Sequence, residues 1–470
     1  MDRSRLAARE PDLAGLSILV IGAGRSGLAA SRLAASRGAR VTLCDRAPAT
    51  QLTDVARQAA NAGIELHTGG QPPELLEQAD LVVVSPGVPT DAQILRRARE
   101  RGLPVWGEVE LAVRFCRGRI VGVTGSNGKS TVTTMTGAIL RGAGLPGATG
   151  GNLDRPLSEL LDVDAPDAWH ALELSSFQLE TVETLRAQVA VVLNLSPDHL
   201  DRHGSFEAYA AAKARLLELQ ERDDFAILNA DDEASLPLHD AVRGRLHLFS
   251  VRDTKRAAAF VRAGRLVLRT DHGEEELLAA DQLPLPGEHN LANALAAALA
   301  GRLAGAPAEA IVRGLREYHP LPHRLELVAE SRGIRFYNDS KATNPASASS
   351  ALTAFPSRSV HLILGGQDKG ASWDALAGII RDRARRILLI GRSASMLREL
   401  LTEAGVPVED CGTISKAVTR AAKGAKAGDV VLLAPGCASF DQYRNFEERG
   451  EDFRRAVCAL VDRERGGADG

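Results

Sequence analysis

The sequence predicts an α/β protein of three domains, each built around a mostly parallel sheet. Short apolar runs of strand length alternate with helix-forming segments along most of the chain. Two of these runs, starting at Ser17 and Ile120, lead into glycine-rich loops that open helices. A chain of 470 residues is also too long for a single core. We expect a Rossmann-like domain, a central P-loop ATPase-like domain and a C-terminal Rossmann-like α/β domain, spanning residues 1–107, 108–320 and 321–470.

Composition and charge exclude several classes of protein. A formal net charge of −3 argues against a general nucleic-acid binder. No apolar run approaches the roughly 18 residues that span a bilayer, and the N-terminus lacks a signal-peptide pattern. The five cysteines lack the spacing of a zinc site or a disulfide framework, which is typical of a reducing compartment. We therefore expect a cytoplasmic monomer, without membrane insertion, that acts on small molecules. The polar residues 1–12 have no assigned role.

The first domain carries a dinucleotide-type loop. A buried strand at Ser17–Ile21 runs into Gly22–Gly27, which has the spacing Gly-x-Gly-x-x-Gly. A second strand, Arg40–Cys44, ends in the acidic Asp45. On its own this pattern indicates an NAD-dependent dehydrogenase or, more generally, a phosphorylated ligand at a helix N-terminus. A later strand ends in Ser85-Pro86-Gly87, which is either a ligand-binding turn or a plain turn.

The second glycine-rich loop is the most informative run in the sequence. The apolar strand Ile120–Val123 leads into Thr-Gly-Ser-Asn-Gly-Lys-Ser-Thr, residues 124–131, and then into a helix. In such a phosphate-binding loop, backbone N–H groups cradle phosphate oxygens, Lys129 reaches the terminal phosphates and the Ser130 hydroxyl ligates Mg²⁺. Asn127 stands where the usual spacing has glycine, so this is a variant loop. The residues expected to bind ATP here are Gly125, Ser126, Asn127, Gly128, Lys129, Ser130 and Thr131.

Two further strands of the central domain end in candidate site residues. Glu173 closes an apolar strand, and an acidic side chain at that place is a natural Mg²⁺ ligand. A strand that starts at Val189 is followed by a polar cluster that indicates a site rather than a solvated loop. The cluster consists of Asn194, Ser196, Asp198, His199, Asp201, Arg202 and His203.

Other polar residues of the central domain leave alternatives open. Gly150-Gly151-Asn152 is expected in a loop. Lys213 lies on an alanine-rich helix, where residue chemistry alone predicts a solvated lysine. Asn290 or Asn293, at the start of a second alanine-rich helix, could hydrogen-bond an adenine or cap the helix.

The last domain alternates strands and helices. Three of its predicted strands end in polar loops, at residues 339–344, 365–369 and 435–440. Ligands of open α/β sheets bind at such carboxyl ends. Two lysines and several hydroxyl groups in these loops suit a small acidic substrate.

Four separated motifs give the chain a family resemblance. The phosphate loop at residues 124–131 resembles that of the Mur ligase family of ATP-dependent amide ligases. In addition to the four motifs, His323-Arg324 is similar to a pair that those ligases share. Leu172–Glu180, Asn338–Asn344 and Cys437–Gln442 resemble the members of the family that add D-glutamate. The motifs agree in order, and the resemblance covers nearly the whole chain.

The resemblance implies amide ligation. ATP phosphorylates the carboxylate of UDP-N-acetylmuramoyl-L-alanine, the amine of D-glutamate attacks the acyl phosphate, and phosphate leaves, in the synthesis of a peptidoglycan precursor. Two Mg²⁺ ions are implied, together with a carbamylated lysine at Lys213, because an anionic carbamate oxygen suits Mg²⁺ and an ammonium does not. The Gly-x-Gly-x-x-Gly loop is thereby reassigned from NAD to uridine diphosphate.

The same resemblance implies site residues by position. The catalytic groups are Lys129, His199 and Lys213. The metal ligands are Ser130, Glu173, His199 and the carbamate of Lys213. Further ATP contacts are Asn290, Arg324 and Asp339. The UDP-linked substrate is expected at Ser26, Asp45, Arg46, Ser85, Asn152 and His199. D-Glutamate is expected at Thr343, Lys369, Ser439 and Phe440.

Three alternative hypotheses compete with this one. The first is a sister Mur ligase with another amino acid, or a folylpolyglutamate synthase, which uses L-glutamate. The second is an NAD-dependent oxidoreductase with a decoy phosphate loop, and the third is a non-catalytic nucleotide-binding scaffold. ADP release against a panel of amino acids separates the ligases, whereas tight NADH binding without ATP turnover would favour the oxidoreductase.

Overall fold

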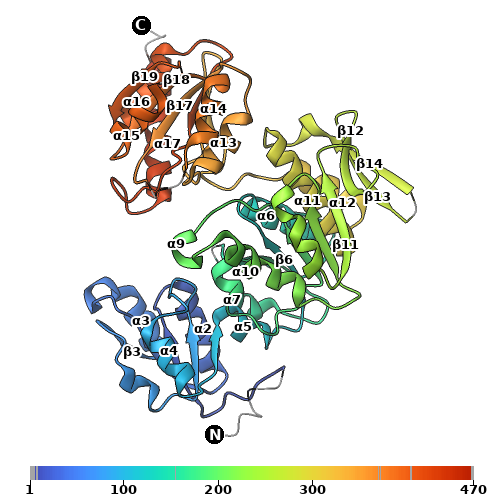
Figure 1. Cartoon of the computed structure of the whole chain (residues 1–470), viewed down its shortest axis with the longest axis vertical. Coiled ribbons are helices and arrows are strands. Elements are labelled where there is room, and N and C mark those ends of the chain that lie inside the picture. The colour runs from blue at the N-terminus through green and yellow to red at the C-terminus, as the bar shows by residue number, and fades with distance from the viewer. Residues whose placement is uncertain are drawn as a thin grey trace. The chain divides into compact units, whose positions relative to one another are not determined.

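The computed structural model forms two compact units (Figure 1). One comprises residues 1–279 and 293–316, and the other comprises residues 280–292 and 317–470. The first unit holds two sheets and the second holds one. The residues that the structure describes are 6, 9–153, 155–271, 273–368, 370, 372–402 and 405–466.

The first sheet has five parallel strands in the order β3-β2-β1-β4-β5. Its strands are β1 (Ser17–Ile21), β2 (Arg40–Cys44), β3 (Glu65–His67), β4 (Leu81–Val84) and β5 (Val105–Gly107). Its helices are α2 (Arg25–Ser36), α3 (Thr53–Asn61), α4 (Gln93–Glu100) and α5 (Glu108–Val113). Alternate residues of β1 enter two different cores, which is why the strand is apolar throughout.

The second sheet has nine strands in the order β14-β13-β12-β11-β10-β9-β6-β8-β7. Its strands are β6 (Arg119–Thr124), β7 (Thr149–Gly151), β8 (Trp169–Glu173), β9 (Val189–Val192), β10 (Phe225–Asn229), β11 (Arg245–Ser250), β12 (Ala257–Arg262), β13 (Arg265–Thr270) and β14 (Gly273–Ala279). The pairs β12–β13 and β13–β14 are antiparallel, and the other pairs are parallel. Strand β6 lies between β8 and β9, so their carboxyl ends meet at one edge.

The helices of this central region are α6 (Lys129–Gly142), α7 (Leu157–Leu160), α8 (Ser176–Leu179), α9 (Leu200–His203), α10 (Phe206–Glu218), α11 (Glu288–Leu303) and α12 (Ala308–Arg316). Three of them, α6, α10 and α11, have 13 to 16 residues, and the others are shorter. One hydrophobic core joins the first two sheets, because Val20 of β1 and Leu172 of β8 belong to the same buried cluster. The first two domains therefore pack together within the first compact unit.

The third sheet has six strands in the order β15-β16-β20-β17-β18-β19, of which only the β15–β16 pair is antiparallel among the described residues. Its strands are β15 (Glu326–Ser331), β16 (Ile334–Asn338), β17 (Val360–Gly365), β18 (Ala384–Ile390), β19 (Val408–Gly412) and β20 (Val430–Leu433). Its helices are α13 (Pro345–Thr353), α14 (Asp374–Arg383), α15 (Ala394–Leu401), α16 (Ile414–Gly424) and α17 (Phe446–Gly466).

Two local expectations were wrong. Gly150 and Gly151 belong to strand β7 rather than to a loop. A Cβ on either glycine would approach a backbone carbonyl oxygen to less than 2.5 Å, so the close packing of this strand requires glycine. Asn290 lies within the first turn of α11, which begins at Glu288, and is not its cap. Among the described residues, no helix is long and apolar enough to span a membrane.

Candidate active site

The phosphate loop is fixed through its backbone by a neighbouring strand end. Gly128 precedes α6 with φ +84°, a left-handed conformation that glycine adopts without strain. A Cβ at this position would lie 2.4 Å from Oδ1 of Asn293. Asn194 Oδ1 accepts a hydrogen bond from the Asn127 N–H at 2.8 Å, and Asn194 Nδ2 donates to the Asn127 carbonyl at 3.0 Å. The asparagine in the variant loop is therefore held by its main chain, from the end of β9.

Lys129 places a positive charge against the loop. Its Nζ donates to the carbonyl oxygens of Gly125 at 2.9 Å and Ser126 at 2.8 Å. A phosphate held by the N–H groups of the loop and of the α6 N-terminus would meet this ammonium. The sequence prediction for Lys129 is therefore compatible with where the structure puts its side chain.

Ser130, Glu173 and Asn152 form a chain of polar contacts beside the loop. The Ser130 hydroxyl donates to Glu173 Oε2, and Asn152 Nδ2 donates to Glu173 Oε1 at 2.9 Å. Ser130 and Glu173 are each 4% exposed. A buried carboxylate needs hydrogen bonds or a cation, and a hydroxyl with a carboxylate is an oxygen donor set that fits Mg²⁺.

Lys213 is not the solvated residue that its alanine-rich helix predicted. The residue is 1% exposed. Its Nζ donates to the Gly125 carbonyl at 2.8 Å and to Thr124 Oγ1 at 3.4 Å. Burial, together with repulsion from the charge of Lys129, holds the pKa of Lys213 well below its ordinary value, although two nearby carboxylates oppose the shift. Lys213 therefore holds its proton less strongly than an ordinary lysine, beside the phosphate loop.

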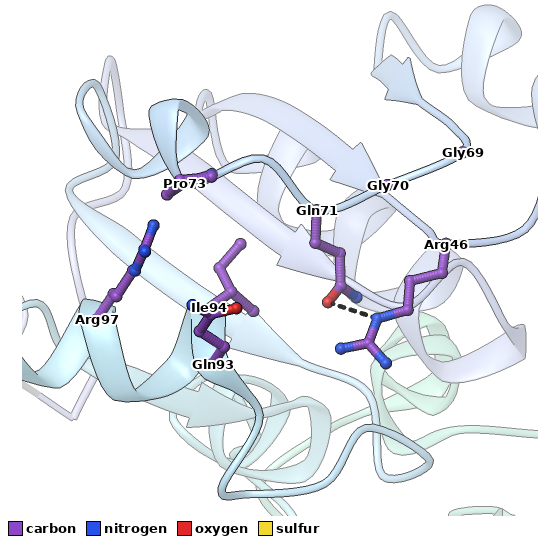
Figure 2. Close-up of a pocket in the computed structure, with 8 residues that line it drawn as sticks. All are labelled: Arg46, Gly69, Gly70, Gln71, Pro73, Gln93, Ile94 and Arg97. Atoms are coloured by element: carbon purple, nitrogen blue, oxygen red, sulfur yellow. Dashed lines mark hydrogen bonds between the residues drawn. The ribbon is translucent and has the colours of Figure 1, made fainter.

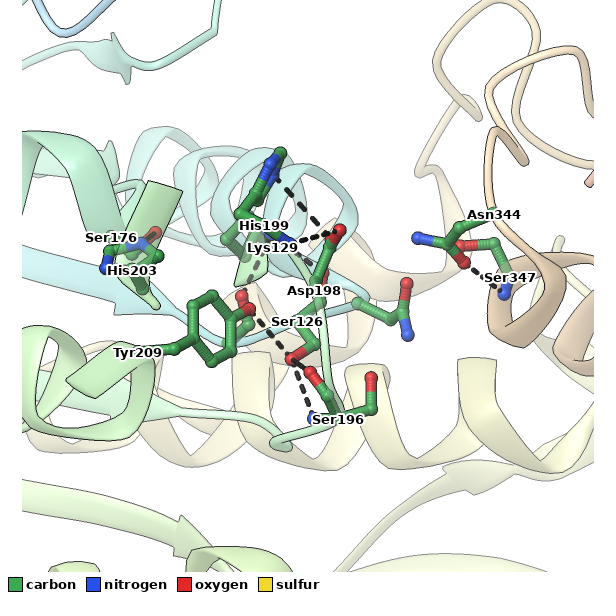
Figure 3. Close-up of polar contacts among 12 residues, drawn as sticks. Ser126, Lys129, Ser176, Ser196, Asp198, His199, His203, Tyr209, Asn344 and Ser347 are labelled. Carbon is green, nitrogen blue, oxygen red and sulfur yellow. Dashed lines mark hydrogen bonds and ion pairs between the residues drawn. The ribbon is translucent and has the colours of Figure 1, made fainter. Parts of the chain in front are cut away.

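Tyr209 is a site residue that the sequence analysis missed. Its hydroxyl lies 2.9 Å from Ser126 Oγ, which also accepts from the Ser196 N–H at 2.8 Å (Figure 3). Lys213 Nζ lies 4.6 Å from the centroid of the Tyr209 ring. The spacing of Tyr209 and Lys213 could have indicated it, because residues four apart on a helix lie on the same face.

His199 lies at the same carboxyl edge in a strained conformation. Its φ of +54° is unusual for a residue with a side chain. The imidazole makes an edge contact with Phe177 at 4.8 Å between centroids, and its Nε2 lies 3.7 Å from Asp198 Oδ2. The side chain is 45% exposed, so a ligand could reach it.

Asp45 and Ser85 hold the first glycine-rich loop. Asp45 Oδ2 accepts from the Ala23 N–H at 2.7 Å, and Asp45 Oδ1 accepts from the Ala47 N–H at 2.8 Å. The Ser85 hydroxyl donates to the Gly22 carbonyl at 2.7 Å. As the structure stands, both predicted substrate residues stabilise this edge of the first sheet.

A separate cavity of about 430 Å³ lies elsewhere in the first domain (Figure 2). It is lined by Arg46, Gly69, Gly70, Gln71, Pro73, Gln93, Ile94 and Arg97. Arg46 Nε donates to Gln71 Oε1 at 3.2 Å on one side of it. Of the residues predicted to bind the UDP moiety, Arg46 lines this cavity, whereas Ser26, Asp45 and Ser85 do not.

In the second unit, Asp339 is a predicted ATP-binding residue whose carboxyl group has a raised pKa. Its Oδ1 accepts from the Leu325 N–H at 3.1 Å. Burial raises the pKa of Asp339 to about 6, although the charge of Arg324 opposes this. Asn290 Nδ2 donates to the Pro286 carbonyl at 2.7 Å.

The polar loops of the third sheet follow neighbouring strands, as predicted. Strand β20 pairs in parallel with β16 on one side and β17 on the other. The buried Arg449 joins two of these loops, because its guanidinium donates to the carbonyls of Ser340 at 2.8 Å and Cys437 at 3.0 Å. Of the predicted D-glutamate residues, Thr343 is half-buried, Ser439 is buried, Phe440 is 68% exposed and Lys369 lies outside the described residues.

Cys116, Asp164 and His170 form a group of metal-ligating types that the sequence did not indicate. Asp164 Oδ1 already accepts from the Gly118 N–H at 2.8 Å and lies 3.0 Å from His170 Nε2, and its other oxygen accepts from the Arg117 N–H at 2.8 Å. These contacts tie the chain that enters β6 to the start of β8.

Three family models match the chain in sequence order. They are the Mur ligase MurD-like N-terminal domain at residues 16–107, the Mur ligase middle domain at 123–301 and the Mur ligase glutamate ligase domain at 323–437. A UDP-N-acetylmuramoylalanine–D-glutamate ligase of Acidobacterium capsulatum is 45% identical over 95% of this chain and 97% of its own. A ligase of the same name from Anaeromyxobacter dehalogenans is 47% identical over 95% of this chain and 98% of its own.

The chain belongs to the Mur ligase family. Two solved structures share the fold of this Mur ligase at a TM-score of 0.60, and each covers 95% of this chain and 100% of its own. One is a pseudomurein peptide ligase type C from Methanothermus fervidus, at 20% identity, and the other is a UDP-N-acetylmuramate–alanine ligase from Thermotoga maritima, at 18%. The predicted three-domain α/β fold is confirmed, while the boundaries at residues 107/108 and 320/321 stay predictions.

Proposed function

We propose that this Mur ligase adds D-glutamate to UDP-N-acetylmuramoyl-L-alanine, with conversion of ATP to ADP and phosphate, in cytoplasmic peptidoglycan precursor synthesis. The observation that carries the proposal is the arrangement at the carboxyl edge of the central sheet. Lys129 faces the phosphate loop, Ser130 contacts the buried Glu173, and an amine with lowered pKa, Lys213, lies beside them. The choice of D-glutamate is supported by the names of the two relatives that cover 95% of the chain.

The reaction needs electrostatic stabilisation by the protein more than covalent catalysis. A carboxylate oxygen of the muramoyl-alanine attacks the γ-phosphorus of ATP, an O–P bond forms, and ADP leaves. The amine of D-glutamate then attacks the acyl carbon, loses a proton and expels phosphate, so an amide remains. Lys129 and the loop N–H groups stabilise charge on the transferred phosphoryl group. Mg²⁺, held by Ser130 and Glu173, would neutralise further charge there.

Lys213 fits a carbamate ligand. A neutral amine is required for the reaction R–NH₂ + CO₂ → R–NH–COO⁻ + H⁺, and the lowered pKa of Lys213 favours that form. The product would be an anion near the positive charge of Lys129, and a second Mg²⁺ needs an anionic oxygen ligand. We assign His199 to that second metal and to the substrate as well.

The remaining residues are assigned by position. ATP would contact Asn290, Arg324 and Asp339 beyond the phosphate loop. The UDP-linked substrate would contact Ser26, Asp45, Arg46, Ser85 and Asn152. D-Glutamate would be bound by Thr343, Lys369, Ser439 and Phe440. Asp339 and Thr343 lie on one loop of the third domain, and Ser439 and Phe440 lie on another. Arg449 joins these two loops, which supports a shared site within that unit.

ADP release by the purified chain tests this function. We expect release that requires both UDP-N-acetylmuramoyl-L-alanine and D-glutamate, with one amide formed per ADP. Turnover with L-alanine, a diamino acid or L-glutamate instead would show a different ligase. Tight NADH binding without ATP turnover would restore the oxidoreductase hypothesis, and a chain that binds nucleotide without any turnover would be a scaffold.

A further inference from the structure

Arg202 links the first domain to the central domain within the first compact unit. Its Nη1 donates to the Pro86 carbonyl at 2.7 Å, and its Nη2 donates to Glu180 Oε2 at 2.8 Å. The guanidinium also lies over the Phe177 ring, 4.0 Å from its centroid. The side chain is 13% exposed. A planar guanidinium with two hydrogen bonds and a stacked ring has little freedom to move, and a lysine could not reproduce all three contacts.

A polar chain supports Arg202 from behind. Glu180 Oε1 lies 3.1 Å from His203 Nδ1, and His203 Nε2 lies 2.9 Å from Ser176 Oγ (Figure 3). Burial lowers the pKa of His203. In the neutral tautomer with its proton on Nδ1, the imidazole would donate to Glu180 and accept at Nε2 from the Ser176 hydroxyl. With both oxygens of its carboxylate engaged, Glu180 provides a fixed partner for Arg202.

The two ends of this contact belong to different parts of the proposed reaction. Pro86 lies in the turn after β4, next to Ser85, where we place the UDP end of the substrate. Phe177 contacts the His199 ring at 4.8 Å between centroids, at the edge where phosphoryl transfer takes place. A substrate that is bound by its UDP group in one domain and reacts through its carboxylate in the next requires these two places to be held at a constant separation.

We propose that Arg202 is a positioning residue that holds the UDP-binding turn in register with the phosphoryl-transfer site. This inference rests on the proposed function. Arg202 acts through the Pro86 carbonyl on one side and through Phe177 on His199 on the other. A misplacement of about 1 Å in a positioned reaction can cost about 10²-fold in rate. Removal of Arg202 should therefore lower kcat with the UDP-linked substrate and leave the KM for ATP unchanged.

The test compares two substrates in the full-length wild-type chain and in the Arg202→Met and Arg202→Lys variants. The substrates are UDP-N-acetylmuramoyl-L-alanine and N-acetylmuramoyl-L-alanine, which lacks the UDP group and so has no part bound at the turn after β4. Arg202→Met should lower kcat for the UDP-linked substrate by about 10- to 100-fold. It should leave kcat/KM for the shorter substrate within about twofold. Arg202→Lys, which keeps the charge and one hydrogen bond, should lie between.

The matched control is Arg96→Met, which removes an exposed arginine paired with Asp91 in the same first domain and should behave as wild type. Equal losses with both substrates, or a raised KM for ATP, would show that Arg202 only supports the local structure around His199, and the proposal would fall. Full activity of Arg202→Met with the UDP-linked substrate would also overturn it. Failure of the proposed function itself would appear differently, as a wild-type chain without D-glutamate-dependent turnover.

Discussion

Two strand–loop–helix motifs of this Mur ligase look alike in sequence, but side chains of opposite charge contact the backbones of their loops. In the loop after β1, the carboxylate of Asp45 accepts the N–H of Ala23 at 2.7 Å. In the loop after β6, the ammonium of Lys129 donates to the carbonyls of Gly125 and Ser126. A carboxylate in a glycine loop occupies an N–H group that a phosphate would use, whereas an ammonium attracts the phosphate.

The difference teaches that the glycine pattern gives the backbone shape and that neighbouring side chains decide the ligand. Both loops follow a buried parallel strand and open a helix. The second loop is also surrounded by Asn194, Glu173 and Lys213 from adjacent elements. The first loop has Asp45 and Ser85 instead, which bind the loop itself. Substitutions in the two loops should therefore have different consequences.

Lys129→Ala should have the largest effect on activity. It removes the side-chain ammonium that we assign to the transferred phosphoryl group, and loss of one such stabilising group costs roughly 10²–10³-fold in kcat. We expect this loss in steady-state ADP release, whichever amino acid is offered. The thermal unfolding midpoint should stay close to that of wild type, because Lys129 Nζ donates to two carbonyls of its own loop and these bonds join no distant elements. Normal turnover of Lys129→Ala would show that the loop after β6 does not hold the transferred phosphate through Lys129.

Lys213→Ala should have the second-largest effect on activity. If Lys213 carries the proposed carbamate, the substitution removes an anionic ligand of the proposed second metal, and we expect a loss of roughly 10²-fold by analogy with other electrostatic groups. Short carboxylic acids such as acetate or formate should restore part of the rate, because they can occupy the space and supply an anionic oxygen. Lys416→Ala, on an exposed helix position of the third domain, is the control. Unchanged rates in Lys213→Ala would remove the carbamate from the mechanism.

The two loops also differ in how much of their surroundings could be predicted from the sequence. The strands, the loops and the helix starts could be predicted because apolar runs and glycine spacing are local signals. The burial of Lys213 could not, because it depends on carbonyls 88 residues away in the chain, at Gly125. The same holds for Arg202, which reaches Pro86 across 116 positions. Strand β7 was missed because its two glycines are selected by close packing and not by a turn.

Gly27→Ala tests the shape of the first loop. A Cβ there would lie 1.8 Å from the Gly22 carbonyl oxygen and 2.6 Å from Ser85 Oγ, so the helix must shift away from the strand. We expect a loss of about 1–3 kcal/mol in the free energy of unfolding, measured by urea denaturation. Gly24→Ala is the matched control, because its Cβ would meet nothing within 4 Å and its φ is −71°. Similar stabilities of the two variants would mean that the third glycine of the pattern has no packing role.

Asp45→Asn should have the smallest effect and sharpens the comparison most. Asparagine has nearly the same shape but one acceptor oxygen, so the N–H of either Ala23 or Ala47 loses its partner. A net hydrogen bond is worth about 0.5–1.5 kcal/mol, which predicts a rise of about 2- to 10-fold in the KM for UDP-N-acetylmuramoyl-L-alanine. The KM for ATP and kcat should not change, because Lys129 and its neighbours belong to the other loop. Asp54→Asn, at a side chain that is 82% exposed in the same domain, is the control. An Asp45→Asn variant that instead binds the UDP-linked substrate more tightly would show that the carboxylate repels the diphosphate, so that the charge of the first loop opposes its ligand while the charge of the second attracts it.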